Sequence, residues 1–262
     1  MRMRRKKWAE KELRECDFYY EWPEEDLSFK DRFKKQNNND NTKDNNNIGS
    51  DVNIAPIHIE LGCGKGNFIS KLASQHLDIN YIAVDMIEAM LGLTKRNIEY
   101  EYSKLPINQD VQVTFDNKNK KYNYSKQVIV PNLVLIRENC EYINKVLDEN
   151  DSINRIYINF CNPWPKGKHQ KRRLTHPRQL AQYKKFLAPN GEIFFKTDDD
   201  ELFEASLEYF NAEGFNIISK TYDLVNDDIF AKYPNGHANI ITEHEQMFTN
   251  EGVKIKALIC II

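Results

Sequence analysis

One carboxylate and three glycines stand together at the end of an expected strand, in the run Glu60-Leu61-Gly62-Cys63-Gly64-Lys65-Gly66. Glycines let a backbone turn sharply and approach a ligand closely. A diphosphate-binding dinucleotide loop would read GxGxxG, and its third glycine would fall where this chain has Asn67. Nineteen residues after Gly66 comes Asp85, at the end of the next expected strand, where a carboxylate can bind both hydroxyls of a ribose.

This combination favours S-adenosylmethionine (SAM), a nucleoside that carries an amino acid and no phosphate. The sulfonium and ammonium groups of SAM are positive, so Glu60 can supply the counter-charge. We therefore expect the cofactor contacts to include Glu60, Gly62, Gly64, Gly66 and Asp85. A glycine turn that serves packing alone is the alternative.

A second candidate for the cofactor is Asn139, which follows the third expected strand. Its amide could hydrogen-bond the amino group or a ring nitrogen of adenine. A single polar residue in a loop also serves as a turn former. Both roles of Asn139 stay open.

A rigid turn and a basic run follow the expected strand at residues 155–160. In Asn162-Pro163-Trp164-Pro165 two prolines bracket a tryptophan, so the chain leaves the sheet abruptly and stays stiff. Five of the eight residues from Lys166 to Arg173 are Lys or Arg, which suits a polyanion. The alternatives are a solvated basic loop, and a Trp164 that packs the turn instead of stacking on a base.

Composition sets the bounds of these expectations. The chain has 262 residues, enough for one sizeable α/β domain, and its net charge of −2 means that a polyanion site must come from local clustering. Five cysteines without a CxxC pair are typical of reduced cytosolic thiols. No apolar run approaches the ~20 residues of a membrane span, no His pair has metal-ligand spacing, and we expect a cytoplasmic protein without a metal.

Strand and helix patterns alternate along most of the chain. This alternation predicts a mostly parallel sheet with helices on both faces, and ligands at the carboxyl ends of its strands. The expected strands are Ile57–Leu61, Tyr81–Asp85, Leu133–Ile136, Arg155–Phe160, Glu192–Thr197 and Lys254–Ile262. The expected helices are Asn67–His76, Ile87–Tyr102, Glu141–Asp148, Pro177–Leu187 and Glu201–Gly214.

Three regions differ in composition. Residues 1–34 form a basic and aromatic arm that folds against the body or nucleic acid, or else is a partly disordered tail. Residues 35–55 are an Asn-rich disordered linker, and residues 56–262 are the α/β domain that holds the glycine loop and the basic run. Within that domain, residues 116–126 have the composition of an insertion in a surface loop.

With these motifs in place, the chain resembles the tRNA (guanine-N7)-methyltransferase family of bacterial type. The family modifies a guanosine in the tRNA variable loop with SAM as methyl donor. The resemblance implies a class I SAM-dependent methyltransferase fold, Rossmann-like, with a seven-stranded sheet whose last strand is antiparallel. It also implies methyl transfer to N7 of guanine 46, giving 7-methylguanosine. The matching residues are Met1–Arg4, Trp8-Ala9, Glu60–Gly66, Asp85, Asn162–Lys166, His169, Lys171–Thr175, Thr197-Asp198 and Thr242–Glu245.

The resemblance also implies roles for single residues. For SAM it implies contacts from Glu60, Asp85, Asn139 and Asn162. For the substrate it implies contacts from Lys166, Asp198, Thr242, Glu243, His244 and Glu245. For the RNA it implies contacts from Lys168, His169, Gln170, Lys171, Arg172 and Arg173.

The chain departs from the family at Asn162 and Asn139, where Asp is usual, and at His244, where Tyr is more usual. Guanine N7 already carries an in-plane lone pair, so the reaction needs alignment of N7, methyl and sulfur and no general base. An amide can orient a base but cannot offset the positive charge that methylation creates. We therefore expect two catalytic residues, Asn162 for orientation and Asp198 for electrostatic stabilisation. Asp198 could also cap the helix that follows, alongside its electrostatic role, and Asp199 or Asp200 could supply that cap as well.

Two other functions stay open at this point. Asn162-Pro163-Trp164 also resembles the Asn-Pro-Pro-aromatic turn of amino-methyltransferases that act on adenine or glutamine. A tRNA-binding relic without turnover is the non-enzymatic alternative. Whether the protein is a monomer or a homodimer is also open.

Overall fold

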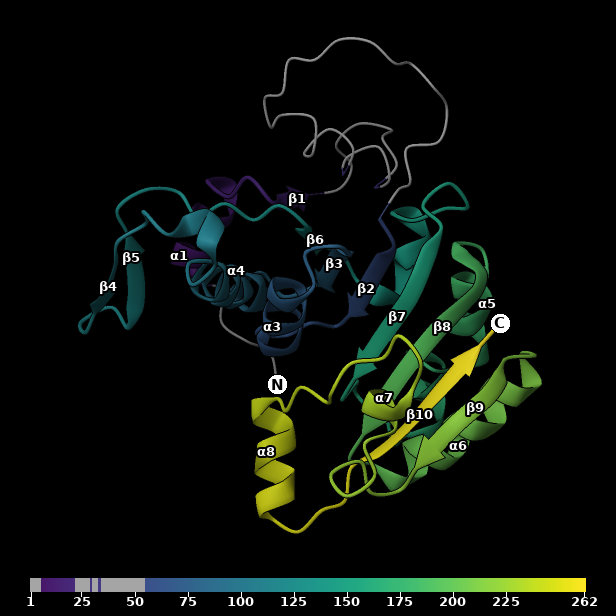
Figure 1. Ribbon diagram of the computed structural model, residues 1–262. Coiled ribbons are helices and arrows are strands. Elements are labelled where there is room, and N and C mark those ends of the chain that lie inside the picture. The colour runs from purple at the N-terminus through teal and green to yellow at the C-terminus, as the bar shows by residue number, and fades with distance from the viewer. Residues whose placement is uncertain (1–5, 22–28, 30–32, 34–54) are drawn as a thin grey trace.

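The computed structural model describes residues 6–21, 29, 33 and 55–262. Its centre is a sheet in the order β1-β6-β3-β2-β7-β8-β10-β9 (Figure 1). The strands are β1 Tyr19–Glu21, β2 Ile57–Leu61, β3 Asn80–Asp85, β6 Leu133–Arg137, β7 Ile153–Asn159, β8 Leu187–Thr197, β9 Asn216–Thr221 and β10 Lys256–Ile261. Strand β10 is antiparallel to both of its neighbours, and the other pairs are parallel. This is the expected class I methyltransferase arrangement.

The expected count of seven strands was wrong, because the sheet has eight strands within the described residues. The additional strand is β1, which belongs to the N-terminal arm and pairs in parallel with the edge strand β6. An edge strand presents unpaired backbone groups, and β1 satisfies those of β6. The aromatic residues of the arm thus extend the sheet.

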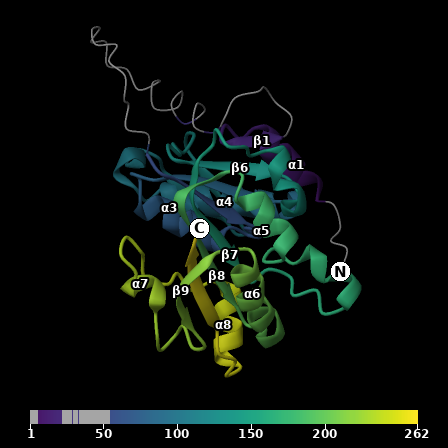
Figure 2. The same ribbon diagram turned by 90° about the vertical axis from the view of Figure 1, so that its right-hand side faces the viewer.

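Helices cover both faces of the sheet and enclose two apolar cores. One core includes side chains of α3 (Asn67–Gln75), α4 (Glu88–Tyr102) and α7 (Ile229–Lys232), and the other those of α5 (Pro177–Tyr183) and α6 (Asp200–Ala212). Figure 2 shows α3 and α7 on one side of β7 and β8, with α5 and α6 on the other. The strands that separate the cores are apolar on both faces, as a sheet covered twice requires.

Residues 6–21 of the arm fold against the body. Helix α1 (Lys7–Arg14) packs on α4, and a Cβ on Gly92 would lie 2.7 Å from the Cβ of Ala9. Arg96 of α4 stacks over the Trp8 ring at 3.8 Å and donates two hydrogen bonds to Glu12. The packed alternative therefore holds for these residues. Residues 1–5 and most of 22–55, including the expected linker, lie outside the described residues.

The polar segment at residues 116–126 belongs to a hairpin. Strands β4 (Val113–Asp116) and β5 (Lys121–Tyr124) form their own two-stranded sheet. Asp116 accepts from the backbone N–H groups of the turn, and Tyr122 stacks on Tyr100 of α4 with ring centroids 4.3 Å apart. This turn chemistry and one aromatic contact make a strand pair from a sequence that we expected to be a loop.

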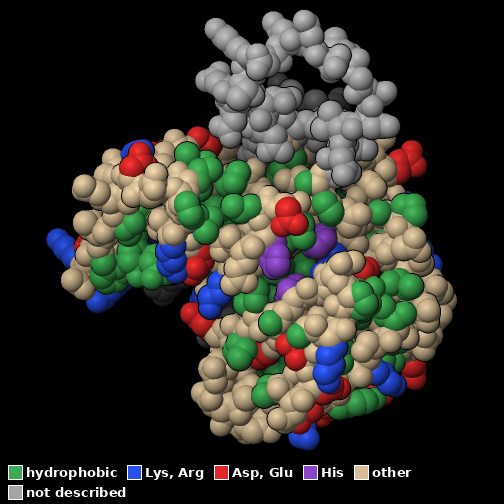
Figure 3. All heavy atoms as spheres, in the orientation of Figure 1, with side chains coloured by type: hydrophobic (Ala, Val, Ile, Leu, Met, Phe, Trp, Pro, Cys, Tyr) green, Lys and Arg blue, Asp and Glu red, His purple; other side chains and the backbone are tan. Residues whose placement is uncertain are grey.

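The remaining helices are short. They are α8 (Glu243–Asn250) and the 3₁₀ helices η1 (Pro106–Asn108), η2 (Cys140–Lys145) and η3 (Gly167–Arg172). No helix in the described part of the chain combines the length and apolarity needed to cross a membrane. On the face shown in Figure 3, acidic and basic side chains are interspersed, as the near-balanced charge predicts.

Candidate active site

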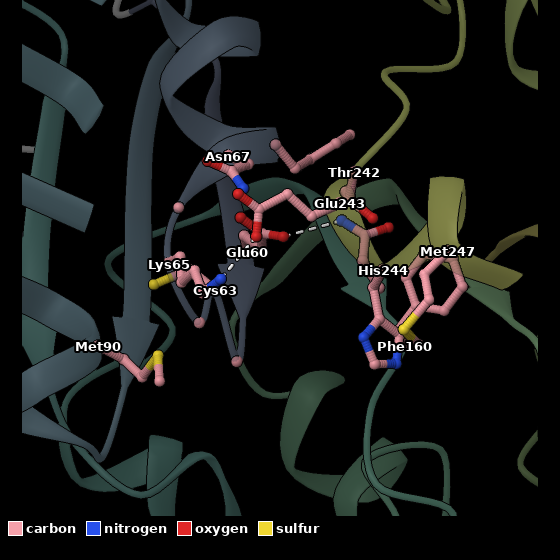
Figure 4. A pocket seen from close by; sticks show the side chains of 15 residues that line it. Glu60, Cys63, Lys65, Asn67, Met90, Phe160, Thr242, Glu243, His244 and Met247 are labelled. Atoms are coloured by element: carbon pink, nitrogen blue, oxygen red, sulfur yellow. Dashed lines mark hydrogen bonds and ion pairs between the residues drawn. The ribbon is translucent and has the colours of Figure 1, made fainter. Parts of the chain in front are cut away.

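A cavity of about 400 Å³ lies at the carboxyl ends of β2 and β7. One wall is the glycine loop with the starts of α3 and α4, and the facing wall is the first turns of α8 (Figure 4). It is therefore at the edge of the sheet where a parallel α/β fold binds its ligands. The lining residues are Glu60, Gly62, Cys63, Gly64, Lys65, Gly66, Asn67, Phe68, Met90, Asn159, Phe160, Thr242, Glu243, His244 and Met247.

The glycine loop requires its glycines for conformation and space. Gly62, Gly64 and Gly66 have φ of 80°, 56° and 75°, a region that other residues rarely adopt. At Gly66 an added Cβ would also lie 2.3 Å from Cγ2 of Thr94 on α4. Backbone N–H groups of the loop bond to the end of β3, so its shape is set by the sheet. Gly66 is thus required for packing against Thr94, and it also lines the cavity.

Asp85 holds the glycine loop from the next strand. Its two oxygens accept from the backbone N–H groups of Gly64 at 3.0 Å and of Ile87 at 2.7 Å. Burial raises the pKa of this carboxyl, and the backbone hydrogen bonds oppose that shift. Asp85 stands just outside the set of lining residues. Each oxygen retains a lone pair for a ribose hydroxyl.

Glu60 is a buried carboxylate at the base of the cavity. It is 2% exposed, and Oε1 accepts from Nδ2 of Asn159 at 2.9 Å. Its Oε2 is buried and has no hydrogen-bond partner among the described residues. Burial raises the pKa of Glu60 to about 7, while the Asn159 amide and the Lys196 ammonium act in the opposite direction. An orphaned carboxylate oxygen of this kind fits the cationic amino acid part of SAM.

The first turn of α8 forms the facing wall. Thr242 caps the helix by accepting from the Glu245 N–H at 3.1 Å. Glu243 pairs with Lys65 of the glycine loop at 2.6 Å, and the His244 ring meets Phe160 edge-on at 5.5 Å. The structure thus brings three of the four expected residues of this segment, Thr242, Glu243 and His244, to the cavity.

Glu245, the fourth residue, faces the interior. It is 0% exposed and forms an ion pair at 2.7 Å with Nζ of Lys196, which is also 0% exposed. The sequence reasoning missed Lys196. The available signal was one lysine in an otherwise apolar strand end, Ile193-Phe194-Phe195-Lys196, since a buried lysine requires a partner.

The Asn-Pro-Trp-Pro turn lies outside the cavity wall. Asn162 is exposed and uses Oδ1 to accept from the Trp164 N–H at 3.0 Å. Trp164 has a φ of 43°, and its ring lies beside His169 and under the guanidinium of Arg172. Its contacts are those of a side chain that packs the turn.

The basic run divides into outward and inward side chains. Lys166, Lys168 and Lys171 are exposed, and His169 and Gln170 are half-buried. Arg172 pairs with Glu141 at 3.0 Å. Arg173 is 1% exposed and donates to the Pro163 carbonyl at 2.6 Å and to Glu201 at 2.7 Å. Its guanidinium therefore braces the turn instead of facing solvent, and we omit it from the proposed RNA contacts.

Two other expected residues have structural partners. Asn139 accepts from the Glu141 N–H at 3.0 Å and caps η2, away from the lining of the cavity. The carbonyl of Asp198 accepts from Nζ of Lys256 at 2.9 Å. The residue that caps α6 is Asp199, which accepts from the Leu202 N–H at 2.7 Å. The capping alternative thus applies to the residue after Asp198.

No group of three or more His, Cys, Asp or Glu side chains within residues 6–21, 29, 33 and 55–262 has a geometry that could hold a metal ion. The five cysteines are free and four of them are buried. The site in this part of the chain is therefore built from carboxylates, amides, glycine backbone and aromatic rings.

Comparison with known proteins agrees with this geometry. A family model described as "Putative methyltransferase" matches residues 54–258. The tRNA (guanine-N(7)-)-methyltransferase of Clostridium beijerinckii is 48% identical over 99% of this chain and 98% of its own length. The proteins of the same name from Clostridium perfringens and Acetivibrio thermocellus are 46% and 42% identical over 99% of this chain and 98% of theirs.

A solved structure described as "Structure of an Antibiotic Related Methyltransferase" superposes with a TM-score of 0.50 over 91% of this chain and 94% of its own. At 16% identity this likeness supports the fold alone. The full-length relatives support the family, because they are 42% to 48% identical over 99% of this chain. The chain therefore belongs to the tRNA (guanine-N7)-methyltransferase family.

Proposed function

We propose that this protein transfers the methyl group of SAM to N7 of guanine 46 in the variable loop of tRNA, giving 7-methylguanosine. The observation that carries the proposal is the unpartnered Oε2 of Glu60 at the base of the cavity beside the glycine loop. The names of the full-length relatives supply the substrate class. A tRNA substrate would place the reaction in the cytoplasm.

In this proposal the glycine loop and Glu60 bind the donor. SAM supplies the methyl group on a sulfonium that is already activated as a leaving group. Gly62, Gly64 and Gly66 let the backbone approach the cofactor, Glu60 meets its cationic amino acid part, and Asp85 takes the ribose hydroxyls. A buried carboxylate attracts a cation more strongly than an exposed one, because little water screens the pair.

The guanine would enter from the side of α8. The N7 lone pair attacks the methyl carbon in line with the departing sulfur, so the task of the protein is alignment and exclusion of water. We assign orientation of the base to Thr242, Glu243, His244 and Asn162, and a further substrate contact to Lys166. Asp198 supplies negative charge as the purine ring becomes positive, since a fixed carboxylate stabilises charge that develops in the transition state.

The outward basic side chains would hold the tRNA. Lys168, His169, Gln170, Lys171 and Arg172 belong to η3, and exposed ammonium groups there suit phosphates. Phosphate contacts set register without reading sequence, and the target base must be unstacked into the cavity. Trp164 stiffens the turn that presents this helix.

The test is methyl transfer from labelled SAM to an unmodified tRNA transcript, followed by nucleoside analysis. We expect label in 7-methylguanosine, and none when guanine 46 is replaced by adenine. Label on an adenine or on protein would favour the amino-methyltransferase alternative. Binding of tRNA without transfer would favour the relic, and an Asn162→Asp variant would then show whether that position is the cause.

A further inference from the structure

A polar row crosses the sheet directly beneath the cavity. Asn159 of β7 and Lys196 of β8 are partners in the parallel register, so their side chains leave the same face of the sheet. Asn159 donates to Glu60 of β2 at 2.9 Å. The row Glu60–Asn159–Lys196 therefore connects the carboxylate in the cavity to the buried ammonium two strands away.

The Lys196 ammonium has a full set of acceptors from one segment. Nζ donates to Oδ1 of Asn239 at 2.8 Å, to the carbonyl of Ile240 at 3.1 Å and to Oε2 of Glu245 at 2.7 Å. An ammonium has three donors, so all of them bind residues 239–245. Burial of a charge is costly unless it is paired and hydrogen-bonded, so this segment is held where Lys196 is satisfied.

The same segment makes one wall of the cavity. Thr242, Glu243 and His244 line the cavity. All three lie between Ile240 and Glu245, which both accept from Lys196. Behind the cavity, Nζ of Lys196 is 5.4 Å from the Phe68 ring centroid and 5.6 Å from that of Phe160. Both rings line the cavity, so the Lys196 ammonium lies against two aromatic side chains of the cavity wall.

We propose that Lys196 is a positioning residue for SAM binding. Its buried ammonium fastens residues 239–245 to the end of β8 and thereby holds the α8 wall against the glycine loop. The inference rests on the proposed function, because it takes the cavity to be the SAM site. It assigns to Lys196 no contact with cofactor or substrate.

An ion pair that joins the two walls directly is more exposed. Lys65 and Glu243 form an ion pair at 2.6 Å, with side chains 49% and 65% exposed. Exposed ion pairs contribute little, because water screens them and two long side chains lose freedom. The buried contacts of Lys196 therefore contribute more to the spacing of the two walls than the exposed Lys65–Glu243 ion pair does.

The experiment begins with SAM binding to the full-length wild-type chain, measured by calorimetry. Absence of binding there would refute the proposed function and leave Lys196 without a role in it. With binding established, Lys196→Met removes the ammonium and keeps most of the stem. We expect its Kd for SAM to rise at least about tenfold, with Kd for tRNA within about twofold of wild type.

A single change also leaves the buried Glu245 unpaired, which lowers stability for reasons unrelated to position. The double variant Lys196→Met with Glu245→Met removes both charges, and we expect Tm to recover toward wild type while the Kd for SAM stays raised. Recovery of Tm and SAM affinity together would overturn the proposal, since Lys196 would then act through stability alone. An unchanged Kd in a folded single variant would do the same.

The chain offers a matched control in the middle of the same strand. Glu192 forms an ion pair at 2.5 Å with the buried Arg155, and neither residue lines the cavity. Glu192→Gln breaks that pair, and we expect it to lower Tm without changing the Kd for SAM by more than about twofold. A loss of SAM affinity in this control equal to that of Lys196→Met would count against a specific role for Lys196.

Discussion

The glycine loop and the Asn162–Arg173 segment both stood out in the sequence, and the structure treats them differently. In the glycine loop, residues at positions 60, 62, 64 and 66 line one cavity together. In the second segment Asn162 bonds to its own turn, and Arg173 is buried against Pro163 and Glu201. A motif that acts through its backbone conformation can be predicted from its own residues. The direction of a long side chain depends on the residues packed around it.

The largest expected effect is at Gly66. Gly66→Ala adds a Cβ 2.3 Å from Thr94 at a φ of 75°, so we expect loss of measurable SAM binding and a marked fall in Tm. Gly252→Ala is the control, because Gly252 has a φ of 77° with open space around its Cβ. It should cost about 1 kcal/mol of stability from backbone strain and leave SAM binding intact. Equal behaviour of the two variants in calorimetry would show that the loop tolerates displacement.

The next effect concerns the charge of Glu60. Because burial raises its pKa to about 7, affinity for SAM should increase as pH rises from about 5.5 to about 7.5 and the carboxyl ionises. Glu60→Gln should bind SAM about 10- to 100-fold more weakly above neutral pH and lose this pH dependence. A wild-type affinity that stays flat over this range would remove Glu60 from the cofactor site.

The same pKa has a consequence for stability without ligand. From about pH 4.5, the usual value, to about pH 7, the folded state holds a proton on Glu60 that the unfolded chain has released. The free energy of unfolding from this group therefore falls as pH rises through that window. Urea titrations at several pH values should show a different pH dependence of the free energy of unfolding in wild type and in Glu60→Gln. The same pH dependence in both proteins would mean that Glu60 titrates at its ordinary pKa.

Two smaller effects, on stability and on tRNA affinity, distinguish the buried Arg173 from the exposed Lys168. Arg173→Met removes the buried guanidinium that donates to Glu201 and to the Pro163 carbonyl, so we expect a loss of about 1–3 kcal/mol of stability. Lys168→Ala removes an exposed ammonium, so Tm should stay unchanged while tRNA affinity falls and the salt dependence of binding decreases by about one ion. Filter binding at several salt concentrations would decide, and a stable Arg173→Met with weak tRNA binding would reverse our assignment.

The smallest expected effect is at Asn162. Asn162→Asp alters one exposed amide whose Oδ1 bonds to Trp164, so stability should change by less than about 0.5 kcal/mol. We expect kcat to rise by less than about tenfold, since a carboxylate adds stabilisation of the charge on guanine without changing alignment. Single-turnover kinetics at saturating SAM would measure it. A much larger rise would show that a carboxylate at position 162 supplies the electrostatic stabilisation that we assign to Asp198.

Local pattern was enough for most of the fold. Apolar runs such as Ile57–Leu61 and Leu133–Ile136 became strands of the main sheet within a residue of their expected ends. Strand β9 was missed because Asn216-Ile217-Ile218-Ser219-Lys220-Thr221 is half polar, and it is a strand because β10 pairs with it. Asn139 was a candidate for the cofactor, and the structure shows its turn-forming alternative, since its Oδ1 accepts from the N–H of Glu141 two residues on.

By itself the sequence determined the alternation of elements and the tight loop at Gly62, Gly64 and Gly66, because backbone preferences and apolar periodicity act over a few residues. The family was indicated by the resemblance of its motifs and shown by the full-length relatives. Only the tertiary structure decided that β1 joins the sheet, that Arg173 faces inward, and that Lys196 meets Glu245 across 49 positions of sequence. The physical reason is burial: a charge removed from water must find its partner, and packing determines which residues are near enough.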